Sequence, residues 1–335
     1  MSAGDNLSAL HAQRALLDAG RWRVWEPLLW VALFASPLVF PQYAAIVNEI
    51  AIVALFAVSL DLVLGYTGIV SLGHAAFLGF GAYAAALFAK HVMPDPLLGL
   101  IVGTAAATVL GALCSLTILR GTDLTRLMVT LGMALILMEL ANKLDWLTGG
   151  SDGLQGVVMG PVLGRFEFDL YGQTAAWYSL TVLLVLFVLA RRWVNSPWGA
   201  TLMAVRDNPL RAMAIGIPVH HRLAVVYTVA AALAGAAGAL LAQTTGFASL
   251  DVFALERSAD VMLMLVIGGV GWLYGGVVGA VVFKLMHDVI SGITPQYWTF
   301  WIGLFLVVLV MVGRERLIRP WRWFGHAANE KGGVR

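Results

Sequence analysis

Long apolar runs alternate with short polar breaks along most of the chain. Ten of these runs carry almost no charge, and most approach the length of about 20 residues that a helix needs to cross a bilayer. The pattern predicts an all-α polytopic membrane protein with about ten transmembrane helices. The eighth and ninth runs flank a glycine-rich turn, so one broken element is the alternative there. The runs cover residues 28–43, 45–64, 69–89, 97–119, 124–143, 174–193, 223–244, 258–272, 275–291 and 297–313.

The longest polar interruption covers residues 196–222, between the sixth and seventh runs. It opens with Ser196 and Pro197, which are typical of a helix N-terminus. The residue before a proline avoids helical angles, so Asn208 disfavours one continuous helix and Pro209 favours a new start. The sequence therefore predicts a two-part helical element that is too polar to cross lipid and lies at the membrane surface.

Basic residues gather on one predicted face of the membrane. Lysine and arginine favour the cytoplasmic side, and an even number of crossings places both termini on the same side. The cytoplasmic regions are then the N-terminal segment 1–26, the element 196–222 and the basic tail 314–335, around a transmembrane domain at 27–313. The basic residues on the opposite face are single and scattered: Lys90, Lys143, Arg165 and Arg257.

Composition limits the classes of function. Hydrophobic residues make up 60% of the chain and charged residues 12%, which is more apolar surface than a soluble domain of this length can bury. The one cysteine, Cys114, lies in an apolar run, so no internal disulfide can form. No lysine follows a glycine, which excludes a P-loop, and no HExxH or Cys/His cluster occurs. We therefore expect no enzyme activity and no cofactor in this chain.

A glycine-rich stretch at residues 65–83 joins the second and third runs. Small residues let helix backbones approach closely, and hydroxyls satisfy backbone groups that a helix break leaves free. Two interpretations follow. The stretch is either a broken or re-entrant element beside a translocation pathway, or simply a place where helices pack tightly. The small-residue run at 230–239 favours close packing alone. The pathway candidates are Gly65, Thr67, Gly68, Ser71, Gly73 and His74.

Ionisable residues inside apolar runs are costly in a bilayer and therefore point to function. Lys284 and Asp288 lie four residues apart on one helix face, which favours a structural ion pair. A proton relay is the alternative for the group, although no continuous chain of such residues is evident. The sequence leaves open whether Asp61, Glu139, Lys284 and Asp288 are structural or functional. The full set is Glu49, Asp61, His74, Glu139, Lys284, His287 and Asp288.

The longest predicted external loop covers residues 145–171. Its glycine-rich beginning holds Gly149, Gly150 and Asp152. Such a loop can cap a pathway or receive a partner protein, and a plain connector is the alternative.

Three blocks of sequence match one family. They are LDLVLGYTGIVSLGHAAFLGFGAYAAAL at 60–87, LTGGSDGLQGV at 147–157, and WGATLMAVRDNPLRAMAIGI at 198–217, the last followed by VIGGVGWLYGGVVGA at 266–280. In this order, from about residue 45 to 313, the chain resembles LivM-type permease subunits of the branched-chain amino acid ABC importers. The resemblance implies a type II ABC importer-like permease in the bacterial cytoplasmic (inner) membrane.

The resemblance also implies partners. A paralogous permease shares the translocation pathway, two cytoplasmic ATPase subunits bind ATP, and a periplasmic substrate-binding protein faces the outer loop with Gly149, Gly150 and Asp152. Pro209 and Met213 stand where the family usually carries acids, so the charges offered to the ATPase differ. The residues implied in ATPase coupling are Trp198, Arg206, Asp207, Arg211 and Gly216.

An importer subunit driven by separate ATPases is the leading hypothesis. Its rival is an ion- or proton-coupled secondary carrier, whose acidic site would be Asp61, Glu139 or Asp288. A passive channel is disfavoured, because a pore does not require the long basic element. The substrate stays open between branched-chain amino acids and urea, amides or aromatic acids, and the permease pair stays open between a homodimer and a heterodimer.

Overall fold

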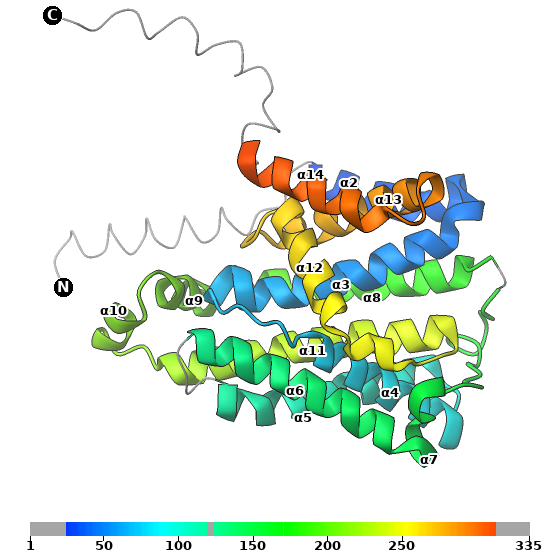
Figure 1. Cartoon of the computed structure of the whole chain (residues 1–335), viewed down its shortest axis with the longest axis horizontal. Coiled ribbons are helices and arrows are strands. Elements are labelled where there is room, and N and C mark those ends of the chain that lie inside the picture. Colours follow the sequence, from blue (N-terminus) through cyan, green and yellow to red (C-terminus); the bar gives the residue numbers. More distant parts are fainter. Residues whose placement is uncertain (1–24, 119–122, 170, 313–335) are drawn as a thin grey trace, which may run out of the picture.

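The computed structural model describes residues 25–118, 123–169 and 171–312. These residues form helices joined by short connections and no β-sheet (Figure 1). Each of the ten predicted runs contains a helix. The helices that match the runs are α2 (Trp25–Val39), α3 (Ala44–Thr67), α4 (Ala75–His91), α5 (Pro96–Ile118), α6 (Asp123–Lys143), α8 (Gln173–Val194), α11 (Val219–Thr245), α12 (Leu255–Gly268), α13 (Leu273–Ile293) and α14 (Trp298–Val312). The shorter elements are η1 (Pro41–Tyr43), α7 (Asp145–Thr148), η2 (Gly150–Asp152), α9 (Pro197–Asp207), α10 (Pro209–Ala214) and η3 (Leu250–Phe253).

Six of these helices are long and apolar enough to cross a membrane, namely α3, α5, α6, α8, α11 and α13. They indicate a multi-pass membrane protein. The other four helices that match predicted runs are shorter: α2 and α14 have 15 residues each, α4 has 17 and α12 has 14. The prediction of ten crossings with both termini in the cytoplasm therefore stays a prediction.

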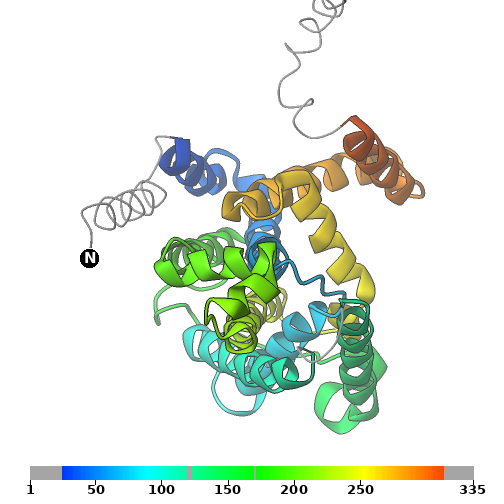
Figure 2. The same ribbon diagram turned by 90° about the vertical axis from the view of Figure 1, so that its left-hand side faces the viewer.

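Two helices, α3 and α11, form the centre of the bundle and are the most buried of the six spans. α3 packs against α8, α11 and α13, and α11 also packs against α4 and α5. Figures 1 and 2 show α4, α5 and α6 on one side of this pair and α2, α13 and α14 on the other. α12 is inclined and runs between these two groups of helices.

Small residues bring α11 and α4 into backbone contact. A Cβ on Gly238 of α11 would overlap the carbonyl oxygen of Leu78, and a Cβ on Gly81 of α4 would overlap the backbone of Gly235. Between membrane helices, close packing of this kind replaces the hydrophobic effect as the source of association. The prediction of close packing for the run at 230–239 is therefore confirmed.

The first helix begins earlier than the sequence predicts. Segment 1–26 was expected to lie outside the transmembrane domain, but α2 already includes its end. Glu26 is buried there because it pairs with Arg191 of α8 at 2.8 Å and accepts a hydrogen bond from the hydroxyl of Tyr274 at 3.2 Å. The rest of that segment and the predicted tail 314–335 lie outside the described residues.

We expect Gly238→Ala to destabilise the protein, because its Cβ has no room against the backbone of α4. Overpacking of this kind costs about 1–3 kcal/mol, which lowers the melting temperature in detergent by several degrees. Gly132→Ala on α6 is the matched control, since a Cβ there meets nothing within 4 Å. Equal melting temperatures for the two variants would contradict the role of this contact.

Candidate functional site

The helix α3 ends at a glycine with a left-handed backbone. Gly68 has a φ of 75°, and its N–H caps the helix on the carbonyl of Leu64 at 3.1 Å. The next six residues, 69–74, form no helix, and α4 begins only at Ala75. The predicted third run at 69–89 is therefore helical only from its seventh residue onward.

The segment after Gly68 turns back along α3. The His74 Nε2 atom lies 2.9 Å from the Ser59 Oγ atom, and the His74 ring stacks on Phe56 with 5.5 Å between centroids. Ser59 is eight residues before the end of α3, or about 12 Å along the helix axis. α4 thus begins inside the bundle (Figure 1), and the structure shows a broken element. We name residues 69–74 the re-entrant segment, because they turn back into the bundle before α4 begins. Its position beside a translocation pathway stays a prediction.

Other helices close around this break. A Cβ on Gly73 would overlap the carbonyl of Thr130 on α6, and the N–H of Ala75 donates to the hydroxyl of Ser258 on α12 at 2.9 Å. Backbone outside a helix is tolerated at membrane depth where protein surrounds it or water reaches it. The predicted pathway side chains that are buried in this conformation are Thr67, Ser71 and His74.

A second contact holds the end of α3 against the turn between α12 and α13. The fully buried Asp61 accepts a hydrogen bond from the N–H of Gly271 at 2.7 Å. The two backbones are so close that a Cβ on Gly65 would lie 2.6 Å from the Gly271 nitrogen. Arg206 of α9 donates to the carbonyl of Gly65 and interacts electrostatically with Asp61. We name this group of Asp61, Gly65, Arg206 and Gly271 the α9 junction.

The predicted surface element is two helices, as the sequence indicated. The side chain of Ser196 caps α9, and the Asn208 Oδ1 atom accepts from the N–H of Arg211 at 2.9 Å to cap α10. Asn208 has an extended backbone between the two helices. Leu202 and Val205 are buried where α9 packs on α3. The predicted break at this position is confirmed, while α11 begins at residue 219, inside the predicted element.

Two of the predicted ATPase contacts turn toward the bundle. Trp198 is half-buried, stacks on Trp193 with 4.5 Å between centroids, and lies under the guanidinium of Arg222 at 4.7 Å. Arg206 reaches back to Gly65 in the α9 junction. Both side chains therefore hold the element on the membrane domain in this conformation.

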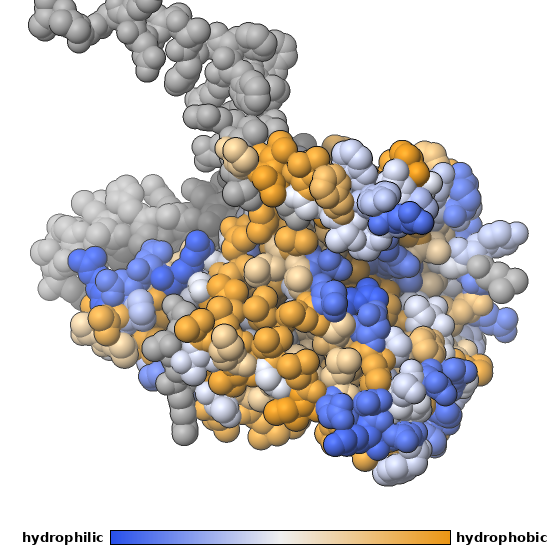
Figure 3. Space-filling model, in the orientation of Figure 1, coloured by the Kyte–Doolittle hydropathy of each residue, from blue (hydrophilic) through white to orange (hydrophobic). Residues whose placement is uncertain are grey.

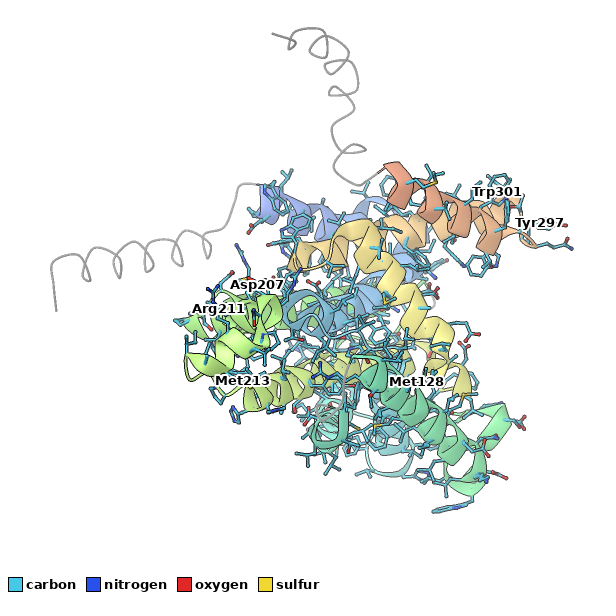
Figure 4. The ribbon with its side chains drawn as sticks, turned by 60° about the vertical axis from the view of Figure 1, so that its left-hand side comes forward. Met128, Asp207, Arg211, Met213, Tyr297 and Trp301 are labelled. Carbon is cyan, nitrogen blue, oxygen red and sulfur yellow. The ribbon has the colours of Figure 1, made fainter. Side chains whose placement is uncertain are left out.

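The other predicted ATPase contacts lie at the exposed end of the element. Asp207, Arg211 and Gly216 are exposed, and Gly216 has a left-handed φ of 87°. Figure 4 shows Asp207, Arg211 and Met213 on this end. The apolar residues exposed beside them are Leu210, Met213 and Ile215.

The intramembrane ion pairs differ from the sequence prediction. Lys284 pairs with Glu49 of α3 and not with Asp288, four residues along its own helix. The i,i+4 prediction was wrong because the carboxylate of a neighbouring helix lies closer to the ammonium group. Glu139 pairs with Lys143 at 3.6 Å, and both side chains are exposed.

The glycine-rich outer loop packs on the connection between α11 and α12. Gly149 and Gly150 have left-handed φ angles of 79° and 55°. Leu154 forms a β-bridge with Ala248, with its N–H 2.8 Å from the Ala248 carbonyl oxygen. Asp152 is exposed on this loop. A role in contact with a binding protein stays a prediction.

Known proteins resemble the chain over most of its length. Residues 42–313 match the family described as the branched-chain amino acid transport system / permease component. The LivM permease protein of the high-affinity branched-chain amino acid transport system is similar to this chain. The protein of Escherichia coli (strain K12) is 26% identical to it and that of Salmonella typhimurium 28%, and each match covers 89% of this chain and 76% of the relative. The fructose import permease protein FrcC of Rhizobium meliloti is 26% identical over 80% of this chain and 76% of its own length. No solved structure matches the chain significantly.

We expect Arg206→Ala to loosen the turn at 269–272 and the end of α3, because it removes the hydrogen bond to Gly65. A hydrogen bond from a charged group contributes about 1.5–3 kcal/mol, so amides in the turn should exchange with solvent roughly tenfold faster or more. Hydrogen exchange followed by mass spectrometry measures this. Arg211→Ala, which removes an exposed arginine of the same element, should leave the exchange unchanged. Identical exchange in the two variants would contradict the α9 junction.

Proposed function

Because the chain belongs to the family of branched-chain amino acid transport permease components, we propose that it is the transmembrane permease subunit of an ATP-driven importer. In this proposal it crosses the bacterial inner membrane ten times, with both termini in the cytoplasm. It forms the pathway with a paralogous permease and works with two ATPase subunits and a periplasmic binding protein. The six long apolar spans and the basic surface element support this arrangement.

The α9 junction is the observation that carries the proposal. A permease without an ATP site needs a part that receives motion from its ATPases, and α9 and α10 project from the bundle in Figure 1. Arg206 and Asp61 tie α9 to the end of α3 and to the turn between α12 and α13. A displacement of α9 therefore acts on α3, on the re-entrant segment that follows it, and on α12. ATP binding to the ATPases supplies the free energy that favours one state of the pathway.

The exposed end of α9 and α10 is the proposed ATPase surface. Asp207 and Arg211 offer one charge of each sign there. Met213 is exposed beside them, where relatives of the LivM type are expected to carry an acid. We therefore propose a contact in which apolar packing replaces part of the charge pairing.

The substrate proposed is a branched-chain amino acid or a related small polar molecule. The matches to the LivM permeases cover 89% of this chain and the match to FrcC covers 80%, which favours amino acids over the sugar named in FrcC. The binding protein selects the ligand in such a system, so this part of the proposal depends on a partner of this chain.

Reconstitution of the permease pair with ATPases and binding protein in proteoliposomes tests the function. Uptake of the binding protein's ligand should require ATP on the side of the membrane where the ATPases are bound. It should persist when a protonophore is added. Uptake that a protonophore abolishes, and that does not respond to ATP, would favour the secondary carrier instead.

Substitutions of the two arginines, Arg206 and Arg211, should impair the importer in different ways. Arg206→Ala should leave the ATPases bound and hydrolysing ATP, while uptake falls about tenfold or more, because the link to Gly65 is lost. Arg211→Glu should weaken ATPase binding itself, since this side chain faces the proposed partner. Co-purification, ATP hydrolysis and uptake separate these results. Arg192→Ala, at an exposed arginine of α8, is the control and should change none of the three. Equal effects of the two substitutions on all three measurements would contradict this division.

A further inference from the structure

Charged side chains gather on one face built by α3, α12 and α13. The Glu49 and Lys284 pair joins α3 to α13, with 50% and 24% of the two side chains exposed. Arg257 pairs with Asp251, and both are about half exposed. Asp260 of α12 and His287 of α13 interact electrostatically, and the two helices pack against each other. We name this the charged face; its other members are Glu256 and Asp288.

Except for Asp251 in η3, the members of the charged face lie within helices that match apolar runs. Lys284 is nine residues from the end of α13, which is about 14 Å along the helix. Charged groups that face lipid at such a depth cost several kcal/mol each, so they normally face protein or a water-filled cavity. Figure 3 shows hydrophilic surface interrupting the apolar front of the molecule in this region.

The exposed face of α5 gives the contrast. Its exposed side chains within the span are almost all apolar, as lipid contact requires. Ile101 of α5 is 62% exposed and lies five residues from the start of its helix, as Asp260 does in α12. The exposed apolar residues of α5 include Ile101, Val109, Leu113 and Leu116.

A small cleft opens beside the charged face. It has a volume of about 60 Å³ and lies where α12 meets α3. Its floor is apolar, with Phe56 and Met264, and Arg257 and Asp260 bring both signs of charge to its lining. The cleft lies close to the re-entrant segment, because Phe56 also stacks on His74.

Exposed apolar side chains flank the charged face on both sides. Figure 4 shows α12 between α14, which carries Trp301 and follows Tyr297, and α6, which carries Met128. All three side chains are exposed. The charged face therefore lies between two apolar surfaces. This arrangement fits a partner protein that packs against both apolar surfaces and leaves water over the charged face.

We propose that the charged face is the wall of a water-filled pathway, closed on its open side by the second permease subunit of the pair. This inference rests on the proposed function, because it assumes that a paralogous permease is present. The partner must span the same membrane and must contact α6 and α14 without burying the charges. The two terminal segments of this chain are predicted to be cytoplasmic, whereas Glu49 lies near the start of α3, and α3 begins at the opposite end of the bundle from α9.

Labelling of single cysteines tests the wall in the complete reconstituted importer. In a Cys114→Ala background, Asp260→Cys should react with a membrane-impermeant cationic methanethiosulfonate about tenfold faster than Ile101→Cys, because only the first position reaches water. Asp288→Cys serves as a second wall position if the Asp260 variant fails to assemble. Addition of the binding protein loaded with its ligand should slow the reaction at the wall positions.

Equal and slow labelling of the wall and lipid positions would overturn the inference. So would labelling in the isolated permease that disappears in the assembled pair, since the face would then be a dry interface. Uptake measured on the same proteoliposomes separates this result from the proposed function. Fast labelling at Asp260→Cys with uptake that ignores ATP would support the wall and refute the ATP-driven importer.

Discussion

The contact between the backbones of Gly65 and Gly271 is the constraint on which the α9 junction depends. Only glycine permits it, since a Cβ at position 65 would meet both the Gly271 nitrogen and the Asp61 carboxylate. Asp61 lies at the buried side of the contact and Arg206 at the side facing α9. The Asp61 Oδ1 atom and the Gly65 carbonyl oxygen thus each accept a hydrogen bond, whereas the buried Asp61 Oδ2 atom has no hydrogen-bond partner among the described residues. A motion that breaks these hydrogen bonds exposes a buried carboxylate, so the α9 junction favours joint movement of its helices.

The re-entrant segment and α12 give that joint movement a consequence. α4 and α12 both begin inside the bundle, and the N–H of Ala75 on one donates to Ser258 on the other. Broken helices that meet in the membrane are where transporters place their binding sites, because the freed backbone groups and helix ends are polar. The charged face continues from this meeting point along α12. In the proposed mechanism, a movement of α9 reaches the helix that carries Arg257 and Asp260 through two hydrogen bonds and the turn between α12 and α13.

Local signals in the sequence predicted the local structure well. The apolar runs located ten helices, and the Asn208 and Pro209 pair located the break between α9 and α10, since both depend on neighbouring residues alone. Partners far apart in the chain were not predictable in this way. Lys284 was assigned to Asp288 because they are close in sequence, whereas its carboxylate is Glu49 on another helix. The bond from Arg206 to Gly65 was not predicted, although a contact of Arg206 with the ATPase stays a prediction. The glycine-rich turn between the eighth and ninth runs gave no signal that Gly271 donates to Asp61.

The central claim is that α9 and the turn between α12 and α13 move as one unit when the ATPases close. Pulsed electron paramagnetic resonance with spin labels at two exposed positions, Met203 on α9 and Val270 on the turn, measures this directly in the assembled importer. A second pair, Met203 and Leu113 on α5, reports movement of α9 against the opposite side of the bundle. The account predicts that trapping the ATP-bound state changes the second distance and leaves the first unchanged. A first distance that changes as much as the second would contradict it.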